Sequence, residues 1–541
     1  MTPIRMMQAL MAGAFALAAH VPAAALAQSG QRTEELGHVS FKTSCNAEAQ
    51  QKFNHGVALV HSFFFPETVR AFTEAAQTDP QCAIAYWGIA ISQRTNPLVL
   101  PLPAAALKSG LEAVQKGNTI GAKTERERDW LAAIELYFKD YDKIDQSARG
   151  LAYERAMEKL TLKYPDDPEA AIFYALALNE TALPSDKTYA KVLKAGALLE
   201  KIAQTLPDHP GVLHYTIHSY DYAPLAKRAI DPANKYAKVA PGAPHARHMP
   251  AHIYSMVGMW AESVASNASS LVAAREQAAR TWPGAAHPAE SHMLDFTQYA
   301  LLQLGHEQRA KQIVDESNTI KKLGFEYVVG YTGLAAVPAR FALERQAWKE
   351  ATALEPRGSQ YPQADAITYF ARALGAARSG DSAAAEQGIA KLKDLRAALE
   401  GANQSYWAEQ VEIQILAASA WTAQTRGQSA EALKFMRAAA DLEDGSEKHV
   451  AMENRLYPIR ELLGDLLMAQ RQPALALKEY ETSNEATPNR LRGLYGAAKA
   501  AEQAKQQDKA RTYFSKLVEL TKNADADRTE IREARAFVAR R

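Results

Sequence analysis

Apolar residues recur along most of the chain at the spacing of amphipathic helices, and these helical segments come in pairs. The clearest pair lies in residues 46–80. Gly56 is on its first segment and Phe72 on its second, and Pro80 follows. A small residue lets two helices approach, an aromatic ring fills the space between them, and a proline ends the second helix. This stretch therefore predicts two packed antiparallel helices.

The same pattern predicts further helices over 103–117, 124–139, 147–164, 165–179 and 187–206, and a further pair over 294–314. Pairs return from about residue 360 to 520, where Gly464 and Tyr480 again supply the small and aromatic positions. Two stretches interrupt this order. Residues 96–103 contain three prolines and predict a loop that folds over a groove. Residues 324–333 contain three glycines, so we expect a soft boundary near 325–340.

Two segments carry the same histidine motif. His214–Tyr220 and His248–Tyr254 both read His-x-x-x-His-x-Tyr, and the two copies are 34 residues apart. Histidines four residues apart lie on one face of a helix. The repetition places one local pattern at the same point of two consecutive structural repeats.

The 34-residue interval and the small, aromatic and proline positions resemble the tetratricopeptide repeat (TPR) superfamily over most of residues 46–520. The segments DPQCAIAYWGIA and HMPAHIYSMVGMW also resemble a group of exported bacterial TPR proteins of unassigned activity. The resemblance implies an all-α solenoid of helix pairs, expected here as two stacked arrays, 46–330 and 340–541. It also implies that the first helix of each pair lines a concave groove that binds a peptide or protein segment.

The turn glycines Gly258 and Gly305 set the register of this resemblance. It implies that one set of side chains lines the groove of the first array: His214, His218, His245, Arg247, His248, His252, His292, Asp295 and Tyr299. Arg247 would either meet an anionic ligand there or be a solvated side chain. Tyr220 and Tyr254 fall at a packing position.

Three interpretations of these histidines stay open. They line a groove for a peptide or small ligand, they hold a metal ion, or they are structural. For a metal site, the two pairs His214, His218 and His248, His252 would converge from adjacent helices, and neutral imidazoles suit Zn or Cu. Asp221 or Asp295 would orient a ring. Pro250 argues against regular geometry, because it would place His248 at a helix cap.

Composition and charge limit the remaining classes of function. The chain has 62 Lys and Arg against 61 Asp and Glu, so no broad basic field is expected for nucleic acid or anionic membranes. No GxSxG or phosphate-binding motif is present, and the sequence does not establish an enzyme.

The N-terminus indicates export. Arg5, an apolar run over 6–19 and a small-residue site before Gln28 predict a signal peptide over 1–27, followed by a loose segment over 28–45. We expect a periplasmic or secreted protein without an integral membrane segment. Cys45 and Cys82, the two cysteines of the chain, would pair there or remain as buried thiols. The sequence thus favours an exported scaffold with a protein partner in the cell envelope, with a metal-binding protein or metalloenzyme as the alternative.

Overall fold

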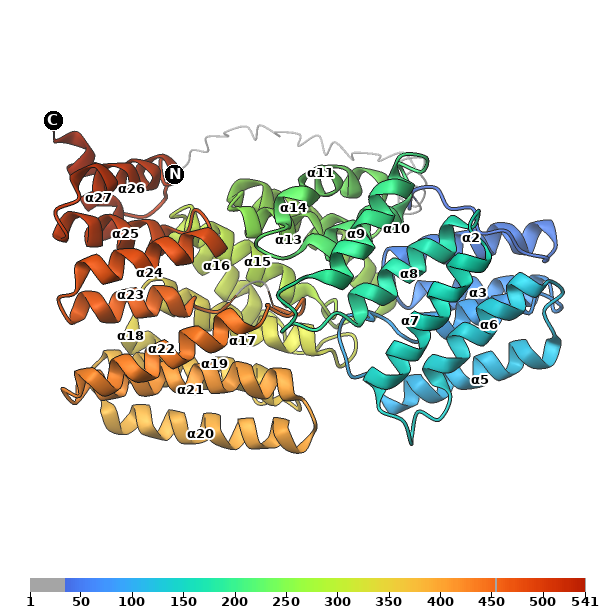
Figure 1. Ribbon diagram of the computed structural model, residues 1–541, viewed down its shortest axis with the longest axis horizontal. Coiled ribbons are helices and arrows are strands. Elements are labelled where there is room, and N and C mark those ends of the chain that lie inside the picture. Colours follow the sequence, from blue (N-terminus) through green and yellow to red (C-terminus); the bar gives the residue numbers. More distant parts are fainter. Residues whose placement is uncertain (1–34, 453–454, 541) are drawn as a thin grey trace, which may run out of the picture.

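The computed structural model describes residues 35–452 and 455–540. The predicted signal peptide, 1–27, lies outside the described residues. The protein is an elongated stack of helices, with the N-terminal helices at one end and the C-terminal helices at the other (Figure 1). Neighbouring helices along the chain pack against each other throughout, as in a TPR-like solenoid. In the described residues the β-structure is one isolated bridge, between Ala286 and Leu323.

The N-terminal third is made of helix pairs whose bounds follow the predicted segments closely. They are α2 (Ala47–His61), α3 (Glu67–Thr78), α4 (Ile84–Ser92), α5 (Ala104–Ile120), α6 (Glu125–Phe138), α7 (Gln146–Lys163), α8 (Pro168–Glu180) and α9 (Ala190–Ala203). The small–aromatic contact is present, because a β-carbon at Gly56 would lie 2.8 Å from the Phe72 ring. Cys45 and Cys82 form a disulfide that ties the start of α2 to the start of α4.

Residues 35–45 do not form the loose segment expected from the sequence. Leu36, Val39 and Phe41 are buried, and the Phe41 ring packs against Phe53 and Trp130. The segment is mostly polar, but three apolar residues, spaced two or three positions apart, pack into the core.

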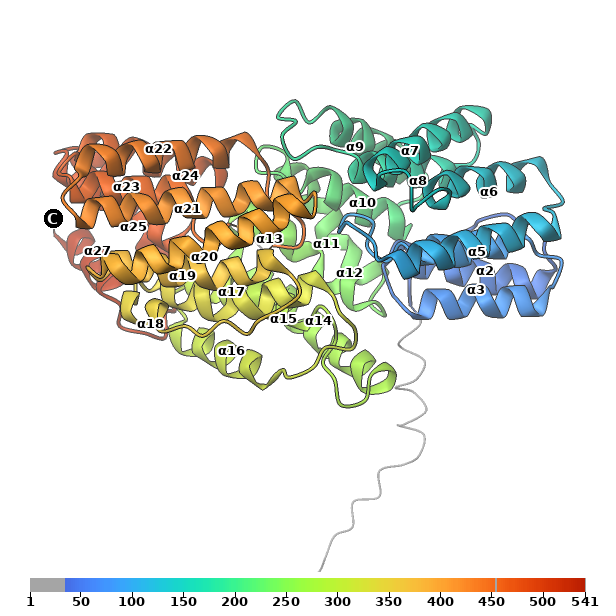
Figure 2. The same ribbon diagram turned by 90° about the horizontal axis from the view of Figure 1, so that it is seen from below.

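The middle of the chain carries the histidine motifs. Its helices are α10 (Pro210–Tyr220), η2 (Ala226–Ala229), α11 (Ile230–Val239), α12 (Pro244–His248), α13 (Pro250–Val257), α14 (Trp260–Thr281), α15 (Glu290–Gln303) and α16 (Glu307–Thr319). Gly258 and Gly305 follow α13 and α15 with φ of 74° and 76°, the left-handed turn conformation that favours glycine. These helices lie midway along the molecule in both views (Figures 1 and 2).

The C-terminal part continues the stack. Its helices are α17 (Val328–Glu344), α18 (Trp348–Thr352), α19 (Pro362–Arg378), α20 (Ser382–Gly401), α21 (Ser405–Thr425), α22 (Ser429–Gly445), α23 (Ile459–Ala469), α24 (Pro473–Ala486), α25 (Leu491–Gln503), α26 (Gln507–Leu520) and α27 (Thr529–Ala539). None of the described helices combines the length and apolar character that crossing a membrane requires.

The soft boundary expected near 325–340 is not a break in the structure. Helix α17 runs through this range and packs on α15 before it and on α19 after it. Gly330 and Gly333 lie within this helix, and a β-carbon at Gly333 would come within 2.6 Å of the His292 backbone nitrogen. The glycines therefore allow a close helix–helix approach, whereas the sequence pattern predicted a boundary there.

Candidate metal centre

Six histidines from four helices meet in the middle of the molecule as two adjoining groups. The first triad is His214, His218 and His245, and the second triad is His248, His252 and His292. Within each triad, one ring nitrogen of every histidine lies within 4.8 Å of the others. The triads adjoin, since the ring centroids of His245 and His248 are 6.1 Å apart. The sequence predicted a single site from the pairs His214, His218 and His248, His252, whereas the structure separates these pairs and completes each with a third histidine.

Pro250 does not disturb the second pair. The helix is interrupted only at Met249, which keeps helical dihedrals of −53° and −34°. His248 on α12 and His252 on α13 therefore stay on one face, with their Nε2 atoms 3.0 Å apart. Two nitrogens bound to one tetrahedral zinc ion at about 2.0–2.1 Å lie roughly 3.3 Å apart, so this spacing suits two ligands of one ion.

Hydrogen bonds fix the tautomers of these two rings. His248 Nδ1 lies 2.7 Å from Asn267 Oδ1, and Asn267 uses its Nδ2 to donate to the Ser263 carbonyl. His252 Nδ1 lies 2.9 Å from a carboxylate oxygen of Asp221. Both partners accept, so both Nδ1 atoms carry the proton. The two Nε2 atoms then face each other with lone pairs, an arrangement that a cation between them would stabilise.

A hydrogen bond also orients a ring of the first triad. His214 Nδ1 donates to the His61 carbonyl at 2.6 Å, which leaves its Nε2 lone pair directed at His245 Nε2, 3.1 Å away. Both ring nitrogens of His218 are buried and have no hydrogen-bond partner in the part of the chain that the structure describes. Buried polar atoms are rarely left unpaired, so the unpaired ring nitrogens of His218 indicate that a bound ligand contacts this triad.

Each triad rests on a phenylalanine. The Phe63 ring packs against His214 and His245 with centroid distances of 4.5 and 5.3 Å. Phe296 takes the same place in the second triad, 4.8 Å from His248 and 4.7 Å from His252. These rings fix the imidazoles and keep their surroundings apolar.

Burial keeps the imidazoles neutral. Five of the six residues are at most 5% exposed, and His245 is partly exposed. Burial, reinforced by the neighbouring histidines, lowers the pKa of His214, His218, His245, His252 and His292 well below 6.5. Burial also lowers the pKa of His248, to about 4. Neutral imidazoles at pH 7 hold the lone pairs that a metal ion requires.

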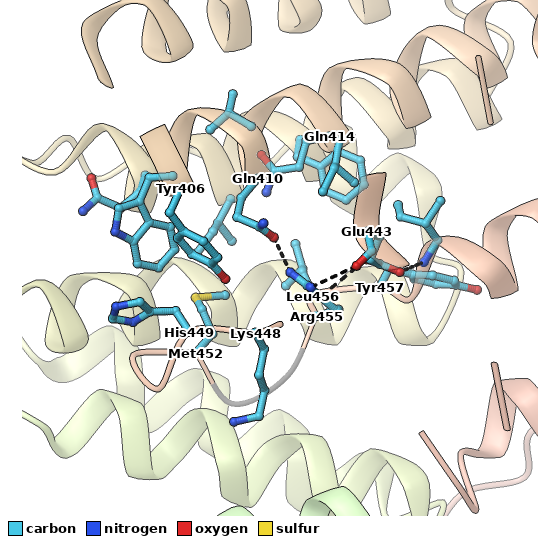
Figure 3. Close-up of a pocket in the computed structure, with 17 residues that line it drawn as sticks. Tyr406, Gln410, Gln414, Glu443, Lys448, His449, Met452, Arg455, Leu456 and Tyr457 are labelled. Atoms are coloured by element: carbon cyan, nitrogen blue, oxygen red, sulfur yellow. Dashed lines mark hydrogen bonds and ion pairs between the residues drawn. The ribbon is translucent and has the colours of Figure 1, made fainter. Parts of the chain in front are cut away.

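A lysine from the C-terminal part reaches the second triad. Lys448, in the segment between α22 and α23, places its Nζ 2.9 Å from the Asp221 oxygen that accepts from His252. Figure 3 shows Lys448 directed away from Tyr406 and His449, which line a cavity of about 60 Å³ on the C-terminal side. Nothing in the local sequence around Lys448 indicated this role, because Asp221 precedes it by 227 residues.

Three of the residues expected beside the histidines have other partners. Asp295 forms a two-pronged ion pair with Arg340, at 2.8 and 3.1 Å. Tyr299 is fully buried and packs on Trp260. Arg247 donates from Nε to the Pro241 carbonyl at 2.6 Å. Of the two carboxylates considered from the sequence, Asp221 contacts a histidine of the triads and Asp295 pairs with Arg340 instead.

A third cluster lies beneath the first triad. Glu169 accepts from His61 Nε2 at 2.9 Å and from His209 Nε2 at 3.0 Å, and His61 Nδ1 lies 3.0 Å from the Tyr215 hydroxyl. All three members are buried. Since His61 also offers its carbonyl to His214, this cluster anchors the first triad.

Comparisons with known proteins do not identify the chain. No family model matches the sequence, and no curated protein matches it. Among solved structures, the APC/C hetero-tetramer Cut9–Hcn1 matches with 13% identity and a TM-score of 0.36, over 94% of this chain and 81% of that chain. The Naa15/Naa10 complex bound to HypK-THB matches with 12% identity and a TM-score of 0.24, over 95% and 92% of the two chains. At this identity and TM-score, neither match indicates a function for this chain.

Proposed function

We propose that this protein binds metal ions at two adjoining three-histidine sites in the middle of its helical array. The facing Nε2 lone pairs of His248 and His252 carry the proposal. Their Nδ1 protons are committed to Asn267 and Asp221, and burial disfavours a further proton on either ring. A metal ion satisfies both lone pairs at once.

Zinc and copper are the ions that best suit these ligands. Neutral imidazole is a ligand of intermediate softness that Zn and Cu bind well, whereas Mg and Ca favour oxygen. Three protein ligands leave one position of a tetrahedral ion for water or a small molecule, as in catalytic zinc sites. Each bound ion could therefore take one further ligand from solution.

The burial of the histidines favours a metal ion over a peptide at this place. A peptide bound in a solenoid groove needs an extended accessible surface. His214, His218, His248, His252 and His292 offer almost none. A protein partner in the cell envelope remains a prediction for other surfaces of the array.

Metal analysis of the untagged protein tests the proposal. After incubation with Zn²⁺ or Cu²⁺ and removal of excess metal, we expect up to two ions per chain. His218→Ala with His252→Ala removes one ligand from each triad and should abolish most of this binding. His55→Ala is the matched control, because His55 is exposed on α2 and lies outside both triads. A protein that stays metal-free after incubation with Zn²⁺, Cu²⁺ or Ni²⁺ would refute the proposal.

A further inference from the structure

A cavity of about 70 Å³ opens beside the first triad. Aromatic rings form much of its wall, among them Phe63, Phe65, Trp282, Phe325 and Tyr327. Thr95 and Asn96, at the start of the proline-rich segment expected to fold over a groove, also line it.

His245 connects this cavity to the first triad. It lines the cavity, and its Nε2 lies 3.1 Å from His214 Nε2. It is also the one member of the first triad that is partly exposed. A ligand in the cavity would thus lie next to an ion held by His214, His218 and His245.

Phe63 forms the wall between the cavity and the imidazoles. Its φ of 47° is in the left-handed region, which a bulky non-glycine residue rarely adopts. This conformation accompanies the stacking of its ring on His245 and its edge contact with His214. Strained residues of this kind cluster at functional sites, where the surrounding structure holds them in place.

The lining of the cavity disfavours charged ligands. None of the described residues that line it is Asp, Glu, Lys or Arg. Its second histidine, His287, lies 3.1 Å from the Gln277 side-chain oxygen and has a pKa lowered by burial to about 4. Moving an ion from water into such surroundings is strongly unfavourable, whereas the transfer of a neutral apolar molecule is favourable.

A second cavity, which Lys448 lines, has the opposite character. It measures about 380 Å³, and Lys187, Glu447, Lys448, Arg455 and Arg460 are among its lining residues. Lys448 reaches from it to Asp221 behind the second triad. A charged ligand would be expected to use this side of the centre.

We propose that the aromatic cavity admits a small uncharged ligand of a few heavy atoms to the metal ion of the first triad. This inference rests on the proposed metal sites and adds the route and the class of ligand. A volume of about 70 Å³ corresponds to roughly five water-sized probes at 10–15 Å³ each, so diatomic gases and similar small molecules fit.

Two probes test the cavity and the metal separately. Xenon binding to metal-free protein, located in xenon-pressurised crystals, reports whether the cavity accepts an apolar atom. Carbon monoxide on Cu(I)-loaded protein, followed by its infrared stretch, reports access to the ion. Ala289→Phe places a ring in the aromatic cavity. Ala486→Phe, the matched control, makes the same change in the charged cavity.

We expect xenon in the aromatic cavity of the parent protein and of Ala486→Phe, and none in Ala289→Phe. With copper content equal in all three proteins, the carbon monoxide band should keep its intensity in Ala486→Phe. It should weaken in Ala289→Phe, which loses the contribution of the first-triad ion, at the pressure that saturates the parent. Absence of xenon from the parent, or an unchanged band in Ala289→Phe, would overturn the cavity proposal. Xenon in place with no copper bound by the parent would overturn the proposed metal sites, and the access route with them.

Discussion

Asp221 is the residue that links the second triad to the rest of the molecule. Its carboxylate accepts from His252 Nδ1 and pairs with Lys448 Nζ, both at 2.9 Å. A carboxylate in this place fixes the tautomer of the imidazole and raises its basicity as a ligand. Lys448 in turn holds the carboxylate in position.

Replacement of Asp221 by Asn should therefore weaken metal binding without abolishing it. The amide oxygen can still accept from His252, but the negative charge is lost and Lys448 is left without its ion pair. We expect a loss of about 10–100-fold in Zn²⁺ affinity, the usual effect of removing such a partner. Calorimetric titration would measure it against Asp208→Asn, a change at an exposed site. Equal Zn²⁺ affinities of the two variants would show that Asp221 does not contribute to metal binding.

At this scale the sequence predicted that the histidines lie together, and it indicated only part of their arrangement. The i,i+4 spacing placed His214 with His218 and His248 with His252, because helix geometry alone fixes that proximity. It could not show that His245 and His292 complete the two triads. Asn267 and Lys448 also lay beyond its reach, because their contacts depend on how distant helices pack.

Helix α17 is the element that holds α15, and with it His292, in place. A β-carbon at Gly333 would lie 2.5 Å from the Ser291 carbonyl carbon. Backbone atoms cannot yield as a flexible side chain does, so the absence of a side chain at Gly333 sets the distance between the two helices.

Gly333→Ala should push α15 away and destabilise the fold by about 1–3 kcal/mol, the usual cost of overpacking. It should also reduce metal content, since His292 would shift with α15. Chemical denaturation gives the first quantity and metal analysis the second. At Gly401, the last residue of α20, an added β-carbon would meet nothing within 4 Å. Gly401→Ala should therefore be neutral or slightly stabilising. A Gly333→Ala protein as stable as Gly401→Ala would contradict this role of α17.

The paired helices themselves could be predicted because their signal is local. Apolar periodicity, turn glycines and the small–aromatic contact of Gly56 with Phe72 all act within one repeat. The glycines of α17 led to a wrong prediction of a boundary, because glycine occurs both in loops and where two helices pack closely. Only the packing of Gly333 on Ser291 shows which of the two applies here.

Across the whole molecule, the C-terminal part packs against the middle helices that carry the histidines, with contacts from α17 and α25 to α15. The Trp260 indole of α14 donates to the Asn489 carbonyl at 2.8 Å, and the Leu491 backbone N–H donates to the Gln303 side-chain oxygen of α15 at 2.9 Å. Lys448 adds its contact with Asp221. Segments far apart in the chain therefore contact the helices of the centre.

The group of buried neutral histidines should make the metal-free protein sensitive to acid. A histidine whose pKa is lowered on folding contributes stability above its unfolded value of 6.5, and this contribution is lost as pH falls toward the folded value. For His248 that window runs from 6.5 to about 4. At pH 5 the loss from this residue alone is on the order of 1–2 kcal/mol.

Urea denaturation of metal-free protein at pH 7 and pH 5 checks this expectation. The free energy of unfolding should fall markedly, and bound metal should reduce the fall at intermediate pH by competing with protons for the same nitrogens. Equal free energies of unfolding at the two pH values would show that the histidines are not held neutral by burial.

The most direct test of the account is anomalous X-ray scattering, at the metal absorption edge, from crystals of the zinc- or copper-loaded protein. We expect two adjoining peaks, one at about 2.0–2.1 Å from the ligating nitrogens of His248, His252 and His292, and one likewise among those of His214, His218 and His245. Loaded crystals without a peak at either triad, or with ions only at surface residues, would contradict the central claim.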